Sequence, residues 1–231
     1  MRDVPAGVGD LIAGLPEDVI IREQYLDFFS NRMFRQTLLT RANAPITRAI
    51  DGGVLDGMAV SSPARRDASR FVTEQGAELS TTEPLVAAAM NELCDRWPAS
   101  LAFPDLVARA SQRLAPATPD AEAVDRLRGA LLEAYVLRVV WPSGCPLPAT
   151  GQPSSRPRAS PLARAQAADG HPVISSLLPG NYALADELQG RLLTLLDGTR
   201  DHAALAAALD APEPSVRTAV SRLTAEGLLV G

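Results

Sequence analysis

Lysine is absent from the 231-residue sequence, so all 22 of its basic side chains belong to arginine. The α-amino group is consequently the one primary amine that the chain offers for modification. Basic residues that are all arginine, beside abundant alanine and proline, are typical of a GC-rich coding sequence. This absence therefore says more about the genome than about a function.

Cysteine is scarce as well, and long apolar runs are missing. The two cysteines, Cys94 and Cys145, are too few for a disulfide framework, which favours a reducing compartment. Together with His171 and His202 they show no zinc-ligand spacing. No apolar run reaches the roughly 18 residues of a membrane span, and no signal-peptide segment opens the sequence. We therefore expect a cytoplasmic protein that binds neither a metal nor a membrane.

Aromatic residues make up 4% of the chain and hydrophobic residues 46%, so the core must be built mainly from leucine, valine and alanine. Such a composition favours helices over sheets. The formal net charge is −5 and the pI is about 5.1, whereas nucleic-acid binding usually shows a basic footprint. The charge balance therefore argues against nucleic acid as a partner.

The start of the chain predicts a lead-in followed by one long helix. Glycine and proline punctuate residues 1–16, which we interpret as a flexible lead-in. Apolar residues then recur at helical spacing over 17–42. The side chains of this helix that we expect to be largely buried are Tyr25, Phe28, Leu38 and Leu39. If they are exposed instead, they mark the docking site.

The rest of the chain predicts short elements on either side of a linker. Residues 55–60 predict a strand, 70–82 a hairpin, 83–96, 104–114 and 120–134 helices, and 135–141 a strand. Proline, serine and glycine dominate residues 142–169, which we interpret as a linker. Helices are predicted over 184–197, 202–209 and 213–225, followed by a short strand over 228–230.

Three short helices that end in a strand occur twice, over 70–141 and 172–231, which predicts two winged-helix-like units. The predicted fold class is mainly α with short β-hairpins, an α+β protein. Its predicted divisions are a lead-in (1–16), a first region (17–141) that contains one winged-helix-like unit, a Pro/Ser-rich linker (142–169) and a C-terminal winged-helix domain (170–231).

Sites for catalysis or for a cofactor are not evident in the sequence. The glycine-rich candidates are Gly7-Val8-Gly9 and Asp51-Gly52-Gly53, and neither joins a convincing strand to a helix. No alternating βαβ pattern and no G-x-S-x-G motif occurs. We expect Cys94 to be a packing residue. The sequence therefore predicts no catalytic, cofactor-binding or metal-binding residue.

The arginines of the first helix are the richest surface feature of the sequence. Arg22, Arg32, Arg35 and Arg41 form either a solvated basic face or a docking face for an acidic partner. Winged helices also bind DNA through their third helix. That helix offers only Arg217 and Arg222 here, which disfavours DNA readout.

Three stretches resemble a known family. The sequence from Glu23 to Leu39, EQYLDFFSNRMFRQTLL, resembles the signature of the methyltransferase regulatory domain, a bacterial module. The similarity continues from Phe71 to Pro98. The stretch LLTLLDGTRDHAALAAAL, from Leu192 to Leu209, resembles the C-terminal winged-helix domain of rickettsial-type protein lysine methyltransferases.

In that family a class I domain that binds S-adenosylmethionine precedes the regulatory domain, and we expect this domain to be absent here. The resemblance thus implies a regulatory and substrate-recognition role through contacts with a methyltransferase domain or a protein substrate. One alternative is a fragment of an intact methyltransferase whose catalytic domain lies upstream. The other is a DNA-binding winged-helix protein. We do not expect the chain alone to be an enzyme or to hold a cofactor.

Overall fold

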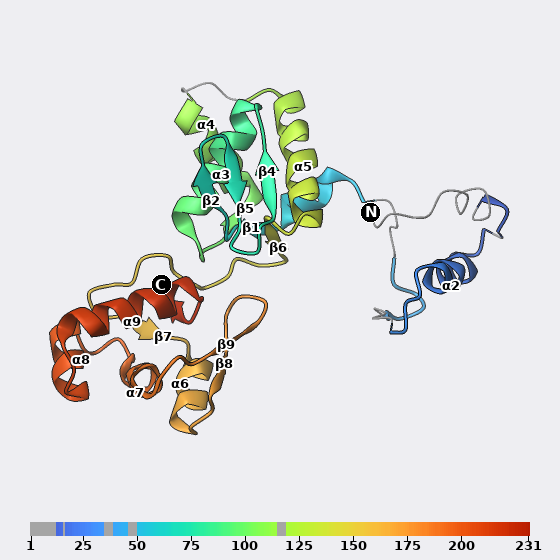
Figure 1. Cartoon of the computed structure of the whole chain (residues 1–231). Coiled ribbons are helices and arrows are strands. Elements are labelled where there is room, and N and C mark those ends of the chain that lie inside the picture. Colours follow the sequence, from blue (N-terminus) through green and yellow to red (C-terminus); the bar gives the residue numbers. More distant parts are fainter. Residues whose placement is uncertain (1–12, 16, 35–38, 46–49, 115–118) are drawn as a thin grey trace. The chain divides into compact units, whose positions relative to one another are not determined.

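The computed structural model describes residues 13–15, 17–34, 39–45, 50–114 and 119–231. The chain forms two compact units, Met1–Arg48 and Ala49–Gly231. Helices and short antiparallel sheets make up the second unit, so the α+β prediction is confirmed (Figure 1). Apart from 13–15, the predicted lead-in lies outside the described residues.

Helix α2 (Val19–Phe29) is the main element of the described part of the first unit. Asp18 caps it, because one carboxylate oxygen accepts hydrogen bonds from the N–H groups of Ile20 (2.8 Å) and Ile21 (3.2 Å). Asn31 has a φ of +48°, a left-handed conformation that asparagine tolerates and that ends a helix. The helix predicted over 17–42 is therefore too long, since 30–34 and 39–42 are not helical.

The first half of the second unit surrounds one hydrophobic core with two small sheets and three helices. After the 3₁₀ helix η1 (Gly52–Gly57), the first sheet has the order β5–β1–β6, with β1 (Ala59–Ser61) antiparallel to both β5 (Leu101–Ala102) and β6 (Trp141–Ser143). The second sheet is an antiparallel meander of β2 (Arg65–Asp67), β3 (Arg70–Val72) and β4 (Glu78–Ser80). The helices are α3 (Pro84–Arg96), α4 (Phe103–Leu114) and α5 (Ala121–Val136).

The predicted hairpin and the three helices of this half are confirmed, but its two other strands are not placed correctly. Residues 52–57 form η1, so the first strand begins only at Ala59. Helix α5 continues to Val136, and Arg138 then turns the chain with a φ of +63°. The N–H groups of Val139 (2.8 Å) and Val140 (3.3 Å) both donate to the carbonyl of Ala134, so these two valines close the helix instead of forming a strand.

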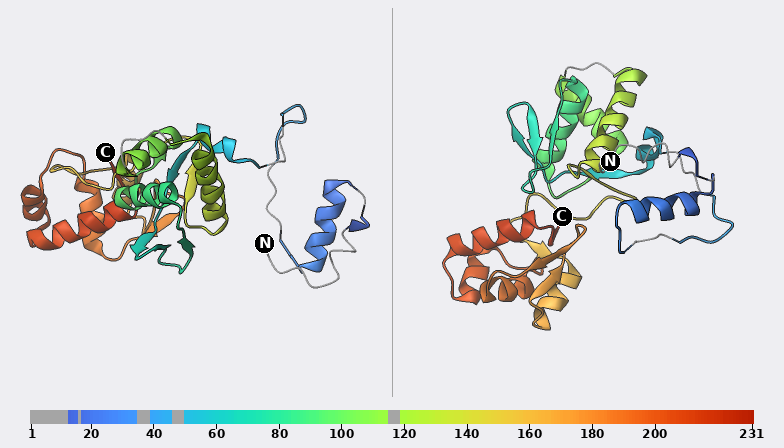
Figure 2. Two further views of the ribbon diagram at one scale, coloured as in Figure 1. Left: turned by 90° about the horizontal axis from the view of Figure 1, so that it is seen from above. Right: turned by 45° about the vertical axis from the view of Figure 1, so that its right-hand side comes forward.

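The second half builds its own core from helices around short strands, as two further views show (Figure 2). Its elements are β7 (Arg158–Ala159), α6 (Pro161–Ala168), β8 (Val173–Ser175), β9 (Asn181–Ala183), α7 (Glu187–Leu195), α8 (His202–Leu209), α9 (Glu213–Ala225) and β10 (Leu229–Val230). Strand β10 pairs with β7, and β8 pairs with β9 in a hairpin that we did not predict. The three C-terminal helices and the final strand are confirmed.

The linker predicted over 142–169 is wrong at both ends, because residues 142–143 belong to β6 and residues 158–168 are also structured. Residues 158–168 form β7 and α6, and Ala163 of α6 is fully buried in the second core. The remaining crossing segment, residues 144–157, is attached to both halves. The Leu147 N–H donates to the Ser100 hydroxyl at 2.7 Å, and the Thr150 N–H donates to the Leu229 carbonyl at 3.2 Å. The segment therefore holds the two cores in one unit.

Candidate functional site

Three of the four arginines predicted to form a docking face lie in the described part of the first unit. Arg32 is exposed, and its guanidinium lies 3.2 Å from the Asp27 carboxylate. Arg22 is half-buried on α2, and Arg41 is exposed beyond it. Arg35 lies outside the described residues. The docking role of these four arginines stays a prediction.

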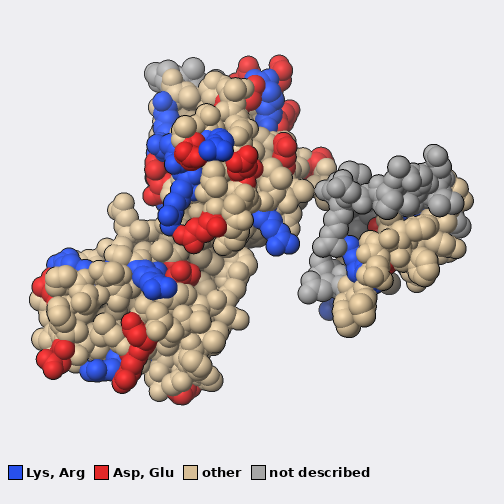
Figure 3. Space-filling model, viewed as in Figure 1, with Lys and Arg blue, Asp and Glu red and all other residues tan. Residues whose placement is uncertain are grey.

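The apolar side chains of α2 are exposed, so the prediction that Tyr25, Phe28 and Leu39 are buried is wrong; Leu38 lies outside the described residues. No residue of α2 is buried, and 83% of Phe28 is accessible. We call the exposed large apolar residues of this helix the α2 apolar surface: Val19, Ile20, Ile21, Tyr25, Phe28 and Phe29. Uncharged residues dominate the described surface of this unit in Figure 3. The helix has an apolar face that nothing covers within residues 17–34 and 39–45.

A glycine turn for S-adenosylmethionine is the site that the family implies, and the described candidate does not fit it. Asp51 caps η1 by accepting a hydrogen bond from the Gly53 N–H at 2.7 Å. A Cβ added at Gly52 would lie 2.5 Å from the Cβ of Arg128, so this side chain already fills the space that the glycine leaves. Gly7-Val8-Gly9 lies outside the described residues. The Asp51-Gly52-Gly53 turn therefore has no room for a cofactor.

One further reactive group among the described residues is the Cys94 thiol. Burial raises the pKa of the Cys94 thiol to about 11, so it is protonated and unreactive at neutral pH. This agrees with its predicted packing role, because Cys94 packs half-buried against the first core. Among the described residues, no group of three or more histidine, cysteine or acidic side chains is arranged to hold a metal. The helices of the described part of the chain include none long and apolar enough to cross a membrane.

A pocket of about 490 Å³ lies beside α3 and the crossing segment. Its charges are already paired: the Glu92 carboxylate accepts hydrogen bonds from Arg113 and, at 3.2 Å, from Arg96. Arg113 also lies 2.6 Å from Asp95. Because both arginines are neutralised in place, this pocket is a structural ion-pair network and not a site for an anion.

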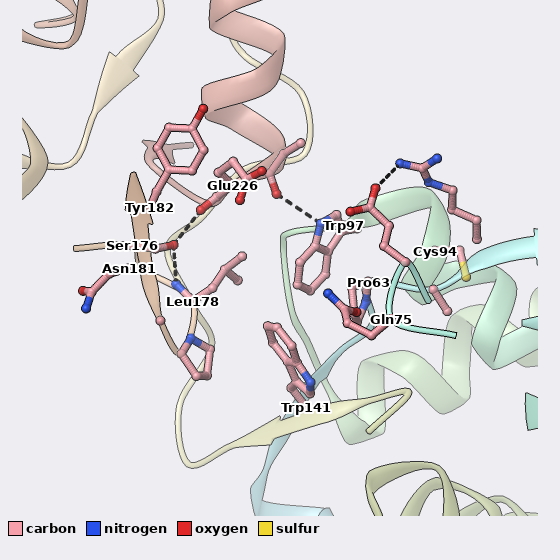
Figure 4. Close-up of a pocket in the computed structure, with 16 residues that line it drawn as sticks. Pro63, Gln75, Cys94, Trp97, Trp141, Ser176, Leu178, Asn181, Tyr182 and Glu226 are labelled. Atoms are coloured by element: carbon pink, nitrogen blue, oxygen red, sulfur yellow. Dashed lines mark hydrogen bonds and ion pairs between the residues drawn. The ribbon is translucent and has the colours of Figure 1, made fainter. Parts of the chain in front are cut away.

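A second cavity, of about 370 Å³, lies between the two cores of Ala49–Gly231. We call it the tryptophan cleft and define it by Trp97, Trp141, Tyr182, Leu178, Glu74 and Glu226. The first core contributes the residue after α3 and the start of β6, and the second contributes the β8–β9 hairpin and the residue after α9. Figure 4 shows both indole rings pointing into the space that faces the hairpin.

Hydrogen bonds hold the aromatic rings of the cleft in place. The Trp97 indole N–H donates to the Ala225 carbonyl at 3.1 Å, which also joins the two cores. Trp141 packs edge-to-face on Trp97, with ring centroids 5.3 Å apart and an interplanar angle of 75°. Tyr182 donates its hydroxyl to Gln189 Oε1 at 3.0 Å. The rings are therefore oriented before any ligand arrives.

The charged side chains of the cleft differ in whether they have a partner. Arg65 and Glu74 form an exposed pair at 2.6 Å. The Glu226 carboxylate, by contrast, has no hydrogen bond or ion pair with any described residue, although its backbone carbonyl accepts one from the Ser176 hydroxyl at 2.6 Å. One arginine and two glutamates line the cavity, so the formal charge of the cleft is negative.

Sequence reasoning missed this cleft because its residues are spread from Pro63 to Glu226 along the chain. One signal was available: the sequence contains only two tryptophans, and both line the cavity. A large aromatic residue in an aromatic-poor chain is a candidate for a surface role.

Two family models match parts of the chain. Residues 5–41 match the model described as a predicted methyltransferase regulatory domain, and residues 155–222 match the C-terminal winged-helix domain of PKMT. Both resemblances are therefore confirmed. The second match begins near β7, inside the predicted linker, which agrees with the place of β7 and α6 in the second core. A search of curated protein sequences found no match.

Solved structures show the same fold at low sequence identity. PKMT2 from Rickettsia typhi matches 100% of this chain and 54% of its own, with a TM-score of 0.83 and 19% identity. PKMT2 from the same organism in complex with AdoHcy matches 100% of this chain and 53% of its own, with a TM-score of 0.77 and 18% identity. The chain thus spans about half the length of these structures.

Proposed function

We propose that this chain is the regulatory and substrate-recognition region of an S-adenosylmethionine-dependent protein methyltransferase and acts through protein contacts. The two family matches and the fold shared with PKMT2 support the methyltransferase context. The observation that carries the proposal is the exposed α2 apolar surface, which lies within the segment that matches the regulatory-domain model. We expect this role in the cytoplasm.

The α2 apolar surface has the chemistry of a protein-docking site. Fully burying one large apolar side chain contributes about 1.5–3 kcal/mol, and aromatic anchors dominate many interfaces. Phe28 and Phe29 pack edge-to-face with centroids 6.4 Å apart, so they present one aromatic patch. Arginines on the same segment, Arg22, Arg32 and Arg41, favour an acidic rim on the partner.

The proposed partner is a class I methyltransferase domain that binds the cofactor. PKMT2 is a protein that forms a complex with AdoHcy, and this chain covers about half of it. The Asp51-Gly52-Gly53 turn, the described glycine-rich candidate, has no room for such a ligand, because Arg128 occupies the space at Gly52. The cofactor would then be held by the partner, and this chain would position the protein substrate.

Calorimetric titration with S-adenosylmethionine tests whether the partner, and not this chain, holds the cofactor. We expect no binding to this chain alone. Micromolar affinity would contradict the proposal, because it would require a cofactor site within these residues.

Direct binding tests the docking surface. The probe is the part of Rickettsia typhi PKMT2 that this chain does not cover, expressed separately and loaded with AdoHcy. We expect Phe28→Ser to weaken binding at least about tenfold, which corresponds to about 1.4 kcal/mol. Leu162→Ser is the matched control, since Leu162 is a 57% exposed apolar residue on α6, which belongs to the other unit. Equal loss in both variants, or no effect of Phe28→Ser, would contradict docking through α2.

The two alternatives have their own tests. The coding sequence before the Met1 codon decides whether a catalytic domain lies upstream in the same protein. DNA binding gains no support from α9, where Arg217 donates to Glu213 at 2.9 Å and is thus engaged within the helix. Salt-dependent retention on duplex DNA would revive that alternative.

A further inference from the structure

We propose that the tryptophan cleft binds an alkylammonium group, the positively charged end of a lysine-type side chain. The proposal rests on the proposed function only for the source of that group, which would be a partner protein. The affinity of the cleft for the cation is a property of Ala49–Gly231 alone and can be measured without any partner.

The two indole rings supply the main attraction. The face of a tryptophan ring carries negative potential, and a cation within about 6 Å of the ring centre is attracted to it. Trp97 and Trp141 lie nearly perpendicular, at 75°, with centroids 5.3 Å apart. Perpendicular rings form a corner in which one cation can contact both side chains. Quaternary and methylated ammonium groups are the ligands that such aromatic corners typically bind.

Pre-organisation adds to this attraction because the rings need not be ordered on binding. The Ala225 carbonyl holds the Trp97 N–H, and Gln189 holds the hydroxyl of Tyr182, of which only 8% is exposed. The opposite wall is fixed as well, since the Leu178 N–H donates to the Ser176 hydroxyl at 3.0 Å. Figure 4 shows Trp97, Trp141 and Leu178 facing the same space.

The charges of the cleft favour a cation over an anion. Arg65, its one basic lining residue, is paired with Glu74 at 2.6 Å. The Glu226 carboxylate, which no described residue engages, is available for a charge-assisted contact. Cys94 is neutral at physiological pH, because burial raises the pKa of its thiol to about 11.

Size and composition agree with an occupant from another molecule. A cavity of about 370 Å³ falls in the range of small-ligand sites, which begins at about 300 Å³. The sequence has no lysine, so no side chain of this protein can supply an alkylammonium group. The occupant must therefore be the side chain of a partner or a small quaternary amine.

Tryptophan fluorescence reads the cleft directly, because both tryptophans of the chain line it. We would titrate the whole chain with three probes: N-acetyl-lysine methylamide, its Nε-trimethyl form, and the neutral carbon isostere with a tert-butyl group. The trimethyl form should cause a saturable change and bind about 5- to 30-fold more tightly than the isostere. Choline serves as a fourth probe: binding as tight as that of trimethyl-lysine would assign the source to a free quaternary amine.

Two variants test whether the charge of Glu226 contributes to binding. Glu226→Gln should weaken trimethyl-lysine binding several-fold while leaving the neutral isostere unaffected. Glu133→Gln is the matched control, because Glu133 is an exposed glutamate on α5 outside the cleft. Equal affinity for the cation and its isostere, or no saturable change with any probe, would overturn the proposal. Loss of methyltransferase docking with retained cation binding would contradict only the proposed function.

Discussion

Helices α2 and α8 differ in one respect that matters for function: α8 buries its apolar residues and α2 does not. Leu205, Ala206 and Leu209 of α8 lie in the second core, whereas no residue of α2 is buried. The two helices begin in the same way, since Asp18 caps α2 and Asp201 caps α8 through its bond to the Ala204 N–H at 2.8 Å. Local sequence therefore specifies both helices equally well.

The difference teaches that helical spacing identifies an apolar face without identifying what covers it. In α8 the cover is supplied by α7 and α9 of the same core. For α2 the described residues of its own unit supply none. An apolar face that its own unit leaves open is typical of a surface that meets a partner.

The largest effect on stability is expected when a buried side chain of α8 is removed. Leu205→Ala removes a fully buried side chain from the second core and should lower the free energy of unfolding by about 2–5 kcal/mol. Leu162→Ala, at an exposed position of α6, should change it by less than about 0.5 kcal/mol. Urea unfolding measures both. Similar values for the two variants would contradict the burial assigned to α8.

The crossing segment provides the next largest effect. A Cβ added at Gly151 would lie 2.6 Å from the carbonyl oxygens of Arg96 and Trp97, so Gly151→Ala must displace backbone. We expect a loss of about 1–3 kcal/mol, as for other overpacked sites. Gly144→Ala in the same segment meets nothing within 4 Å and should be neutral or slightly stabilising. Thermal unfolding of the two variants reports whether the packing of the crossing segment contributes to the stability of the unit.

The elements that the sequence predicted correctly are those with complete local signals. Helix α5 begins after Asp120 and α8 after Asp201, and each aspartate caps its helix through its side chain. The stretch from Tyr135 to Trp141 misled because its β-branched residues suit a strand, yet the N–H groups of Val139 and Val140 close the end of α5. Proline and serine near 158–168 hid a helix that tertiary packing stabilises.

The candidate site was far less predictable. The tryptophan cleft joins residues that lie on either side of the crossing segment, and no local pattern connects Trp97 with Glu226. The arginines of the first unit were visible in the sequence, but their spacing does not say whether a partner faces them. Which distant residues meet in the cleft, and which surface a partner covers, both depend on tertiary contacts that a local sequence pattern does not contain.

A pH-dependent effect of smaller size is expected at Glu92. Burial raises the pKa of this carboxyl, but hydrogen bonds from Arg113 and Arg96 outweigh burial, so its pKa lies below the ordinary value of 4.5. A carboxyl with a lowered folded-state pKa stabilises the fold above its unfolded-state pKa and loses that contribution as pH falls through the lower value. Urea unfolding from neutral pH down to about pH 3 should show this loss, and Glu92→Gln should reduce the slope.

Glu133→Gln is the control for this titration, because Glu133 is exposed on α5 and lies outside both described pockets. It should leave the acid slope of the unfolding free energy almost unchanged. If Glu92→Gln and Glu133→Gln give the same slope, the ion pairs with Arg96 and Arg113 contribute nothing to the first core.

The smallest effect on stability is expected at the exposed helix, and it makes the sharpest test of the comparison. Phe28 is 83% accessible, so Phe28→Ser should change the free energy of unfolding of the chain by less than about 0.5 kcal/mol. Urea unfolding of the variant beside Leu205→Ala measures the contrast directly. A loss above about 1 kcal/mol would mean that the chain itself covers α2, and the comparison would fail. Unchanged stability together with weakened methyltransferase binding would mean that the apolar face of α2 contributes to docking and not to folding.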